Sequence, residues 1–149
     1  MHKENSIVIN ATRARIFEVA ADLSQWSSIL PHYRWIRFIE KSPHKNLVVM
    51  AARRGWIPIK WTSEQEIDSE QNEIRFHHLK AFTKGMKVVW TFKETPKGVE
   101  VRISHDLNST IPLIGKLVAE PIIGNFFIHP IANLTLHHMK LYLEKENGT

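Results

Sequence analysis

The chain has 149 residues, a formal net charge of +5 and 43% hydrophobic residues, which is typical of one globular domain and excludes a disordered chain. It contains no cysteine, which excludes disulfide scaffolds, thiolate nucleophiles and cysteine-ligated metal centres. The lysines and arginines are spread along the chain, so we expect them on solvated faces and predict no nucleic-acid partner.

The first part of the chain predicts one strand and two short helices. Residues 7–9 are branched and apolar, as in a strand, and Asn10 or Thr12 can cap the helix that follows. Ser24 is expected to cap a second short helix, which Pro31 ends. The apolar residues of the first helix recur at helical spacing: Ile16, Phe17, Ala20 and Leu23.

The middle of the chain, from Tyr33 to Leu107, alternates between apolar and polar residues in segments separated by turn residues. This pattern predicts an antiparallel meander with one apolar face, and it places Tyr33 and Trp35 on the same face. Some inward positions carry polar side chains, which need partners when they are buried. These positions are Ser63, Gln65, His78 and His105.

The end of the chain predicts one long helix. A single stripe at helical spacing runs through Phe127, Ile131, Leu134, His138 and Leu141. A strongly curved sheet wrapped over this helix would bury both apolar faces.

The order of elements and several segments resemble the START-like superfamily of polyketide cyclases/dehydrases and lipid-transport proteins. The opening carries the resemblance through residues 7–11, residues 16–23, Trp26 and residues 30–31. Residues 61–65, 89–92 and 98–101 are similar to the central strands of bacterial aromatase/cyclases, and coenzyme-Q-binding START-like proteins share the opening. The resemblance implies an α+β helix-grip fold: a curved antiparallel sheet around a long C-terminal helix, with two short helices after the first strand. It implies that residues 1–149 form a single ligand-binding domain with a cavity between sheet and helix.

The resemblance also implies a set of site residues. In aromatase/cyclases, an arginine on the strand equivalent to that of Trp61 and Ser63 polarises the substrate, and Gln65 takes its place here. A neutral donor stabilises an oxyanion less than a guanidinium does. The predicted catalytic residues are His105, Gln65 and Tyr33. The predicted ligand-binding residues are Trp35, Trp61, Ser63, His78, Trp90, Phe127, Leu134 and His138.

Two functions stay open at this point. A cyclase/dehydratase would use His105 or His78 as its proton carrier, because imidazole titrates near neutral pH, with Gln65 and Ser63 orienting a carbonyl group and Tyr33 as an additional acid. A carrier would hold a lipid or quinone without proton transfer. A third interpretation, a ribosome- or partner-binding module, would depend on the basic surface.

We predict no cofactor and no metal. Neighbouring histidines such as His77 and His78 point apart, and a site joining His78, His105 and His138 is feasible but less favoured. The polar N-terminus and the interrupted apolar stretch at residues 111–131 predict a cytoplasmic protein that does not span a membrane. An acyl-carrier or other transient protein partner is compatible with this picture. Residues 108–125 are interpreted either as a packed loop or as a mobile gate.

Overall fold

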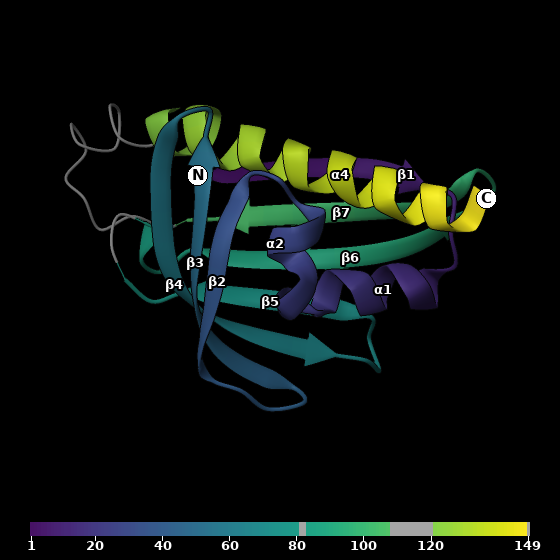
Figure 1. The fold of residues 1–149 in the computed structure, drawn as a ribbon, viewed down its shortest axis with the longest axis horizontal. Helices are drawn as coiled ribbons and strands as arrows, with labels where there is room; N and C mark the ends of the chain where they lie inside the picture. The colour runs from purple at the N-terminus through teal and green to yellow at the C-terminus, as the bar shows by residue number, and fades with distance from the viewer. Residues whose placement is uncertain (81–82, 108–120, 149) are drawn as a thin grey trace.

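The computed structural model describes residues 1–80, 83–107 and 121–148 and shows a curved seven-stranded sheet with a long helix packed across it (Figure 1). Every neighbouring pair of strands is antiparallel, in the order β1-β7-β6-β5-β4-β3-β2. Strands β2 to β7 therefore form the predicted meander, and β1 pairs with β7. The strands are β1 (His2–Ile9), β2 (Tyr33–Glu40), β3 (Lys45–Arg54), β4 (Ile57–Asp68), β5 (Glu73–His78), β6 (Lys87–Thr95) and β7 (Gly98–Asp106).

Short helices follow β1, and the longest helix ends the chain, as predicted. Thr12 caps the first helix by accepting a hydrogen bond from the backbone N–H of Arg15. The second predicted cap is wrong: Asp22 accepts from the N–H of Ser24, so Ser24 lies inside the next helical turn. The helices are α1 (Arg13–Ala21), η1 (Leu23–Gln25), α2 (Trp26–Ile29), the π-helix η3 (Ile122–Ile128) and α4 (His129–Gly148).

Strand β2 departs from the predicted alternation. Tyr33 pairs with Ala52 and Trp35 with Ala51, so one extra residue is inserted in β2 between these pairs. Such a bulge inverts the faces of the residues that follow it. Trp35 is consequently 38% exposed, whereas Ile36 and Phe38 pack against the core. The prediction that Trp35 faces inward is wrong, because alternation does not reveal an inserted residue.

The buried face of α4 also differs from the predicted stripe. Leu134 is 37% exposed and Leu141 is exposed as well. The helix carries leucines on two of its faces, so hydrophobic periodicity by itself could not select the face that packs. The residues that face the sheet are Ile131, Ala132, Thr135, Leu136, Met139 and Leu143.

Polar contacts attach α4 to the first strand. The side-chain amide of Asn5 donates to the Oδ1 atom of Asn133 at 2.7 Å, and Lys140 Nζ donates to the backbone carbonyl of Val8. These bonds fix the helix against the edge strand β1 near both its N-terminal and its central turns. Within the described ranges, each helix is too short or too polar to cross a bilayer.

Candidate ligand-binding site

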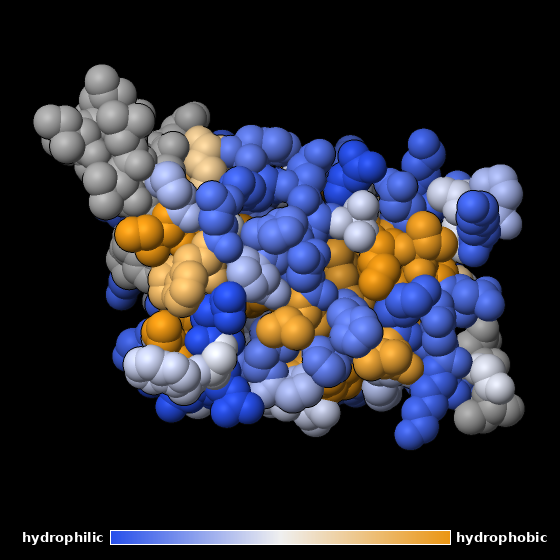
Figure 2. Space-filling view, turned by 90° about the horizontal axis from the view of Figure 1, so that it is seen from above, coloured by the Kyte–Doolittle hydropathy of each residue, from blue (hydrophilic) through white to orange (hydrophobic). Residues whose placement is uncertain are grey.

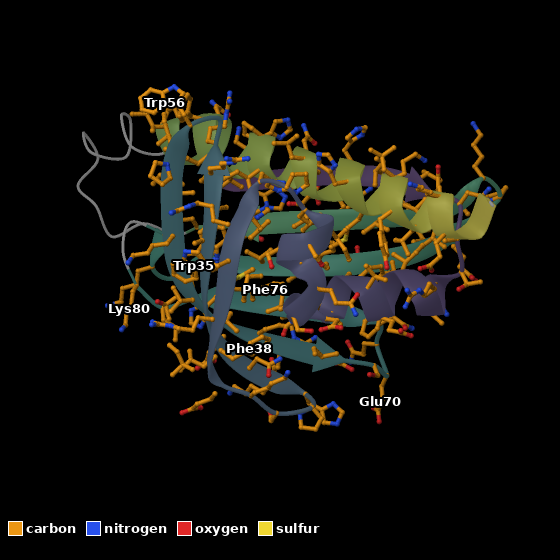
Figure 3. All side chains as sticks on the ribbon, in the orientation of Figure 1. Trp35, Phe38, Trp56, Glu70, Phe76 and Lys80 are labelled. Carbon is orange, nitrogen blue, oxygen red and sulfur yellow. The ribbon has the colours of Figure 1, made fainter. Side chains whose placement is uncertain are left out.

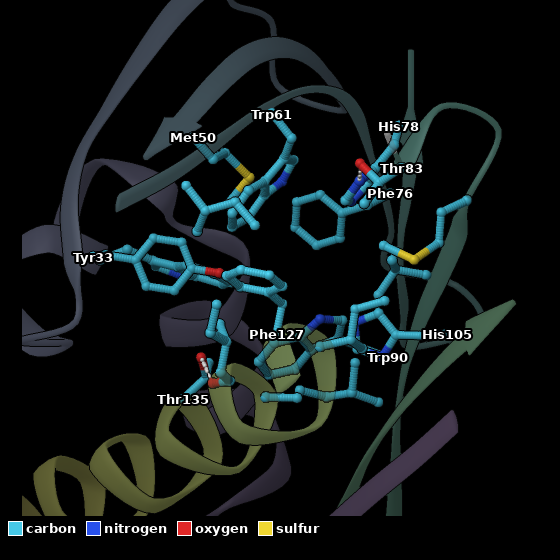
Figure 4. Close-up of a pocket in the computed structure, with 18 residues that line it drawn as sticks. Tyr33, Met50, Trp61, Phe76, His78, Thr83, Trp90, His105, Phe127 and Thr135 are labelled. Atoms are coloured by element: carbon cyan, nitrogen blue, oxygen red, sulfur yellow. Dashed lines mark hydrogen bonds between the residues drawn. The ribbon is translucent and has the colours of Figure 1, made fainter. Parts of the chain in front are cut away.

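A cavity opens between the concave face of the sheet and the N-terminal half of α4 (Figure 4). Its volume is about 80 Å³. Most of its 18 lining residues are aliphatic or aromatic. The lining residues with polar groups other than indole are Tyr33, His78, Thr83, His105 and Thr135. This composition suits an apolar ligand with a few oriented polar groups.

One wall of the cavity carries a hydroxyl pair from β2 and α4. The Tyr33 hydroxyl points toward the middle of the cavity (Figure 4). Burial raises the pKa of Tyr33, so the phenol keeps its proton at neutral pH. Tyr33 is therefore a permanent hydrogen-bond donor on this wall.

His32 supports this wall from behind. The Thr135 hydroxyl donates its proton to the Ile131 carbonyl at 2.8 Å, so it accepts from Nε2–H of His32, also at 2.8 Å. Burial, with a contribution from the nearby His138 ring, lowers the pKa of His32 to about 4. His32 is thus neutral at pH 7, and its Nε2–H group donates to the Thr135 hydroxyl.

The opposite wall carries two histidines from β5 and β7. The ring of His78 stacks on Trp61 with centroids 5.7 Å apart, and its Nδ1 is 2.9 Å from the Thr83 hydroxyl. Burial lowers the pKa of His78 to about 3, and the neighbouring His105 lowers it further. This imidazole is already hydrogen-bonded and stays uncharged.

In the part of the chain that the structure describes, His105 has a ring nitrogen without a hydrogen-bond partner, as His32 does, but of these two histidines His105 lines the cavity. Its Nδ1 atom is buried and has no hydrogen-bond partner among the described residues. Burial lowers the pKa of His105 to about 4, although the adjacent Asp106 carboxylate opposes this. His105 lines the cavity, and a neutral imidazole with an unused nitrogen can exchange a hydrogen bond or a proton with a group that reaches that nitrogen.

Gln65 and Ser63 are buried as predicted, but they do not line the cavity. The Gln65 amide donates to the Ala21 carbonyl at 3.0 Å and accepts from Nδ2 of Asn46 at 2.8 Å. The Ser63 hydroxyl contacts the backbone carbonyls of Glu64 and His77. The prediction that Gln65 reaches into the cavity is wrong, because at this point on β4 the inner face meets the end of α1.

The cavity brings together six of the predicted site residues: Tyr33, Trp61, His78, Trp90, His105 and Phe127. Trp35 and Leu134 are exposed instead, and His138 lies behind the wall, its ring 6.2 Å from that of His32. The possible metal site is therefore not assembled, since His138 is separate from His78 and His105. Of the predicted gate, residues 108–120 lie outside the described residues, and residues 122–125 begin η3.

Three polar residues of this region were missed by the sequence analysis. Thr135 lies one helical turn after the inward-facing Ile131, which was a usable signal. His32 precedes a predicted strand directly after a proline, and Thr83 lies between two strands, so neither had a periodic pattern to mark it.

Comparison with known proteins identifies the family. Residues 9–123 match the model of the family described as polyketide cyclase/dehydrase and lipid transport. The match covers more than half of the chain, so the chain belongs to this family. The fold and family predicted from the sequence are confirmed.

Individual relatives extend this assignment. A Streptomyces halstedii protein named "Putative polyketide cyclase" is 24% identical over 107 residues, which cover 68% of this chain and 95% of the relative. The Zhui aromatase/cyclase of a Streptomyces species has a similar structure, with a TM-score of 0.84, 16% identity and coverage of 99% and 95% of the two chains. A START superfamily protein from Mycobacterium smegmatis gives a TM-score of 0.67 at 13% identity, with 99% of each chain covered. At these identities the structural likeness concerns the fold.

Proposed function

We propose that this protein binds a planar, apolar, oxygen-bearing molecule of the polyketide or aromatic class and promotes its cyclisation and dehydration. The supporting observation is the cavity, where aromatic walls hold a protonated phenol at Tyr33 opposite an imidazole with an unused nitrogen at His105. Aromatic side chains such as Trp61 and Trp90 offer faces on which a planar ligand stacks.

The proposed chemistry uses these two groups as a base and an acid. Neutral His105 takes a proton from a methylene carbon between two carbonyl groups, and the resulting carbanion adds to a second carbonyl carbon. Tyr33 protonates the new alkoxide. The hydroxyl then leaves as water with the proton from the His105 imidazolium, while a second proton from the ring carbon returns to the Tyr33 phenolate. The net change is one carbon–carbon bond formed and one water lost.

A second candidate is a carrier that holds a lipid or quinone without chemistry. It is favoured by the low pKa values of His78 and His105, which keep both rings uncharged at neutral pH. Among the described residues that line the cavity, none is a lysine, arginine, aspartate or glutamate. A carrier would use the same polar groups as hydrogen-bond partners.

The variant His105→Ala distinguishes these functions. In an enzyme, loss of the base should lower turnover of a synthetic poly-β-keto thioester about 10²–10⁴-fold, with much less effect on affinity. In a carrier, it should change affinity by one hydrogen bond, roughly 0.5–1.5 kcal/mol. Native mass spectrometry of the purified protein would identify a retained lipid or quinone directly.

A matched control is His77→Ala, which removes an exposed imidazole on the outer face of β5 beside His78. It should leave both turnover and affinity unchanged. Unchanged turnover in His105→Ala, on a substrate that the wild-type protein converts, would remove His105 from the mechanism.

A further inference from the structure

A basic and apolar surface surrounds the tip of the β3–β4 hairpin, at the end of the molecule where η3 lies. Trp56 stands at this tip, directly after Gly55, and is 89% exposed (Figure 3). Apolar side chains also reach the surface beside the start of α4, where η3 exposes Ile122 and Phe126 (Figure 2). We name this surface the hairpin rim. It consists of Arg53, Arg54, Trp56, Lys60, Ile122 and Phe126.

The two parts of the hairpin rim are joined by Arg54. Its Nε donates to the backbone carbonyl of Phe126 at 3.1 Å, and its guanidinium carbon lies 5.0 Å from the centre of the Phe126 ring. The rim is therefore one connected surface built from several elements.

The two segments that build the hairpin rim carry basic residues and no acidic ones. Residues 53–60 contain three basic residues and no aspartate or glutamate, and residues 121–128 also contain no acidic residue. In the described part of the chain, none of the rim's three basic residues, Arg53, Arg54 and Lys60, forms an ion pair. The other end of β3 differs, because Lys45 there lies 3.8 Å from Glu64 and Glu40 is nearby in sequence. Positive charge thus accumulates at the end that also exposes a tryptophan.

We propose that the hairpin rim docks this protein onto an anionic lipid bilayer, with Trp56 in the headgroup region. Tryptophan favours the membrane interface, and arginine and lysine are attracted to anionic headgroups. A bilayer can accept the projecting Trp56 side chain without a preformed pocket. A folded protein partner would need a pocket that fits this side chain. Weak apolar insertion and weak electrostatic attraction reinforce each other, as in other proteins bound reversibly at membranes.

The inference goes beyond the proposed function and does not require that the cavity ligand be known. Ile59 and Trp61 of the same hairpin line the cavity, as does Phe127 next to Phe126. Docking through the rim would hold these cavity elements close to the bilayer, where an apolar ligand could be taken up or released.

Sedimentation with vesicles tests the proposal. The full chain should bind phosphatidylcholine vesicles that contain about one third phosphatidylglycerol, and it should bind pure phosphatidylcholine much more weakly. Trp56→Ser should lower the partition coefficient about tenfold, and Arg53→Ala about fivefold at low salt. The controls are Ile39→Ser, which changes an exposed apolar residue near the opposite end of β3, and Tyr33→Phe inside the cavity. Neither control should alter vesicle binding.

A second readout uses the absence of native cysteine. A polarity-sensitive dye on Trp56→Cys should report a less polar environment when anionic vesicles are added, whereas the same dye on Ile39→Cys should not. The proposal is overturned if the wild-type chain does not bind anionic vesicles, or if Trp56→Ser and Arg53→Ala bind them as tightly as the wild type does. An equal response of the dye at positions 56 and 39 would also overturn it. Binding of an acidic carrier protein through Trp56, without vesicle binding, would also overturn it in favour of a protein partner.

Discussion

Buried polar groups on the inner face of this sheet fall into two kinds, and their comparison defines the candidate site. Gln65 and Ser63 have their hydrogen bonds satisfied by the backbone and by Asn46. Tyr33 and His105 face the cavity, and His105 keeps one nitrogen without a partner in the described structure. All four side chains point to the inner face of the sheet. An inward-facing polar residue is therefore not by itself evidence of a binding group. What distinguishes them is whether the protein itself already satisfies the side chain.

A pH series should produce the largest effect and tests the histidines around the cavity. The folded-state pKa values of His32, His78 and His105 are about 4, 3 and 4, below the value of about 6.5 in an unfolded chain. The unfolded chain therefore binds more protons in this window, and stability that is complete above pH 6.5 is lost as the pH falls toward 4. We expect a loss of about 1.4 kcal/mol per pH unit for each histidine.

Urea unfolding at pH 7.5, 6.0 and 5.0 measures this slope. His78→Gln should flatten it, whereas His77→Gln, at the exposed neighbouring position, should not. Equal stability at pH 7.5 and 5.0 would show that these rings are not held neutral by burial.

The next largest effect is expected from Gln65→Arg, which introduces the charged donor that aromatase/cyclases are implied to use. Because this side chain is fully buried against Ala21 and Asn46, the guanidinium would be buried without a carboxylate partner. We expect the free energy of unfolding to fall by about 3–5 kcal/mol, without a gain in ligand binding. Chemical denaturation measures the loss, and Glu64→Gln on the outer face should change stability by less than about 0.5 kcal/mol. A stable Gln65→Arg protein with increased cyclase activity would contradict the position that we assign to Gln65.

The smallest of these effects is expected from Thr135→Val. This variant tests the hydrogen bond between Thr135, which lines the cavity, and His32 behind it. The valine keeps the shape of the cavity but leaves the Nε2–H of buried His32 without its acceptor. The free energy of unfolding should fall by about 1–3 kcal/mol. Thr91→Val, on the outer face of β6, is the matched control and should be nearly neutral. If the two variants lose the same stability, the bond between His32 and Thr135 contributes nothing measurable.

The sequence by itself determined the order of elements, the antiparallel meander and the family. The first two depend on local patterns: period-two alternation in strands, helical spacing at both ends and turn residues between segments. The family was indicated by the resemblance of segments such as residues 7–11 and 61–65 to its known members. The same patterns correctly placed Tyr33, Trp61, His78, Trp90 and His105 on the inner face.

Only the tertiary structure decided which inward residues reach the cavity. A bulge in β2 moved Trp35 to the surface, and the packing of α4 on β1 selected Thr135 over Leu134. The end of α1 covers Gln65, although its phase on β4 is the same as that of Trp61. Strand phase fixes the direction of a side chain, but what it meets there depends on elements distant in sequence, because burial and hydrogen bonding are set by three-dimensional packing.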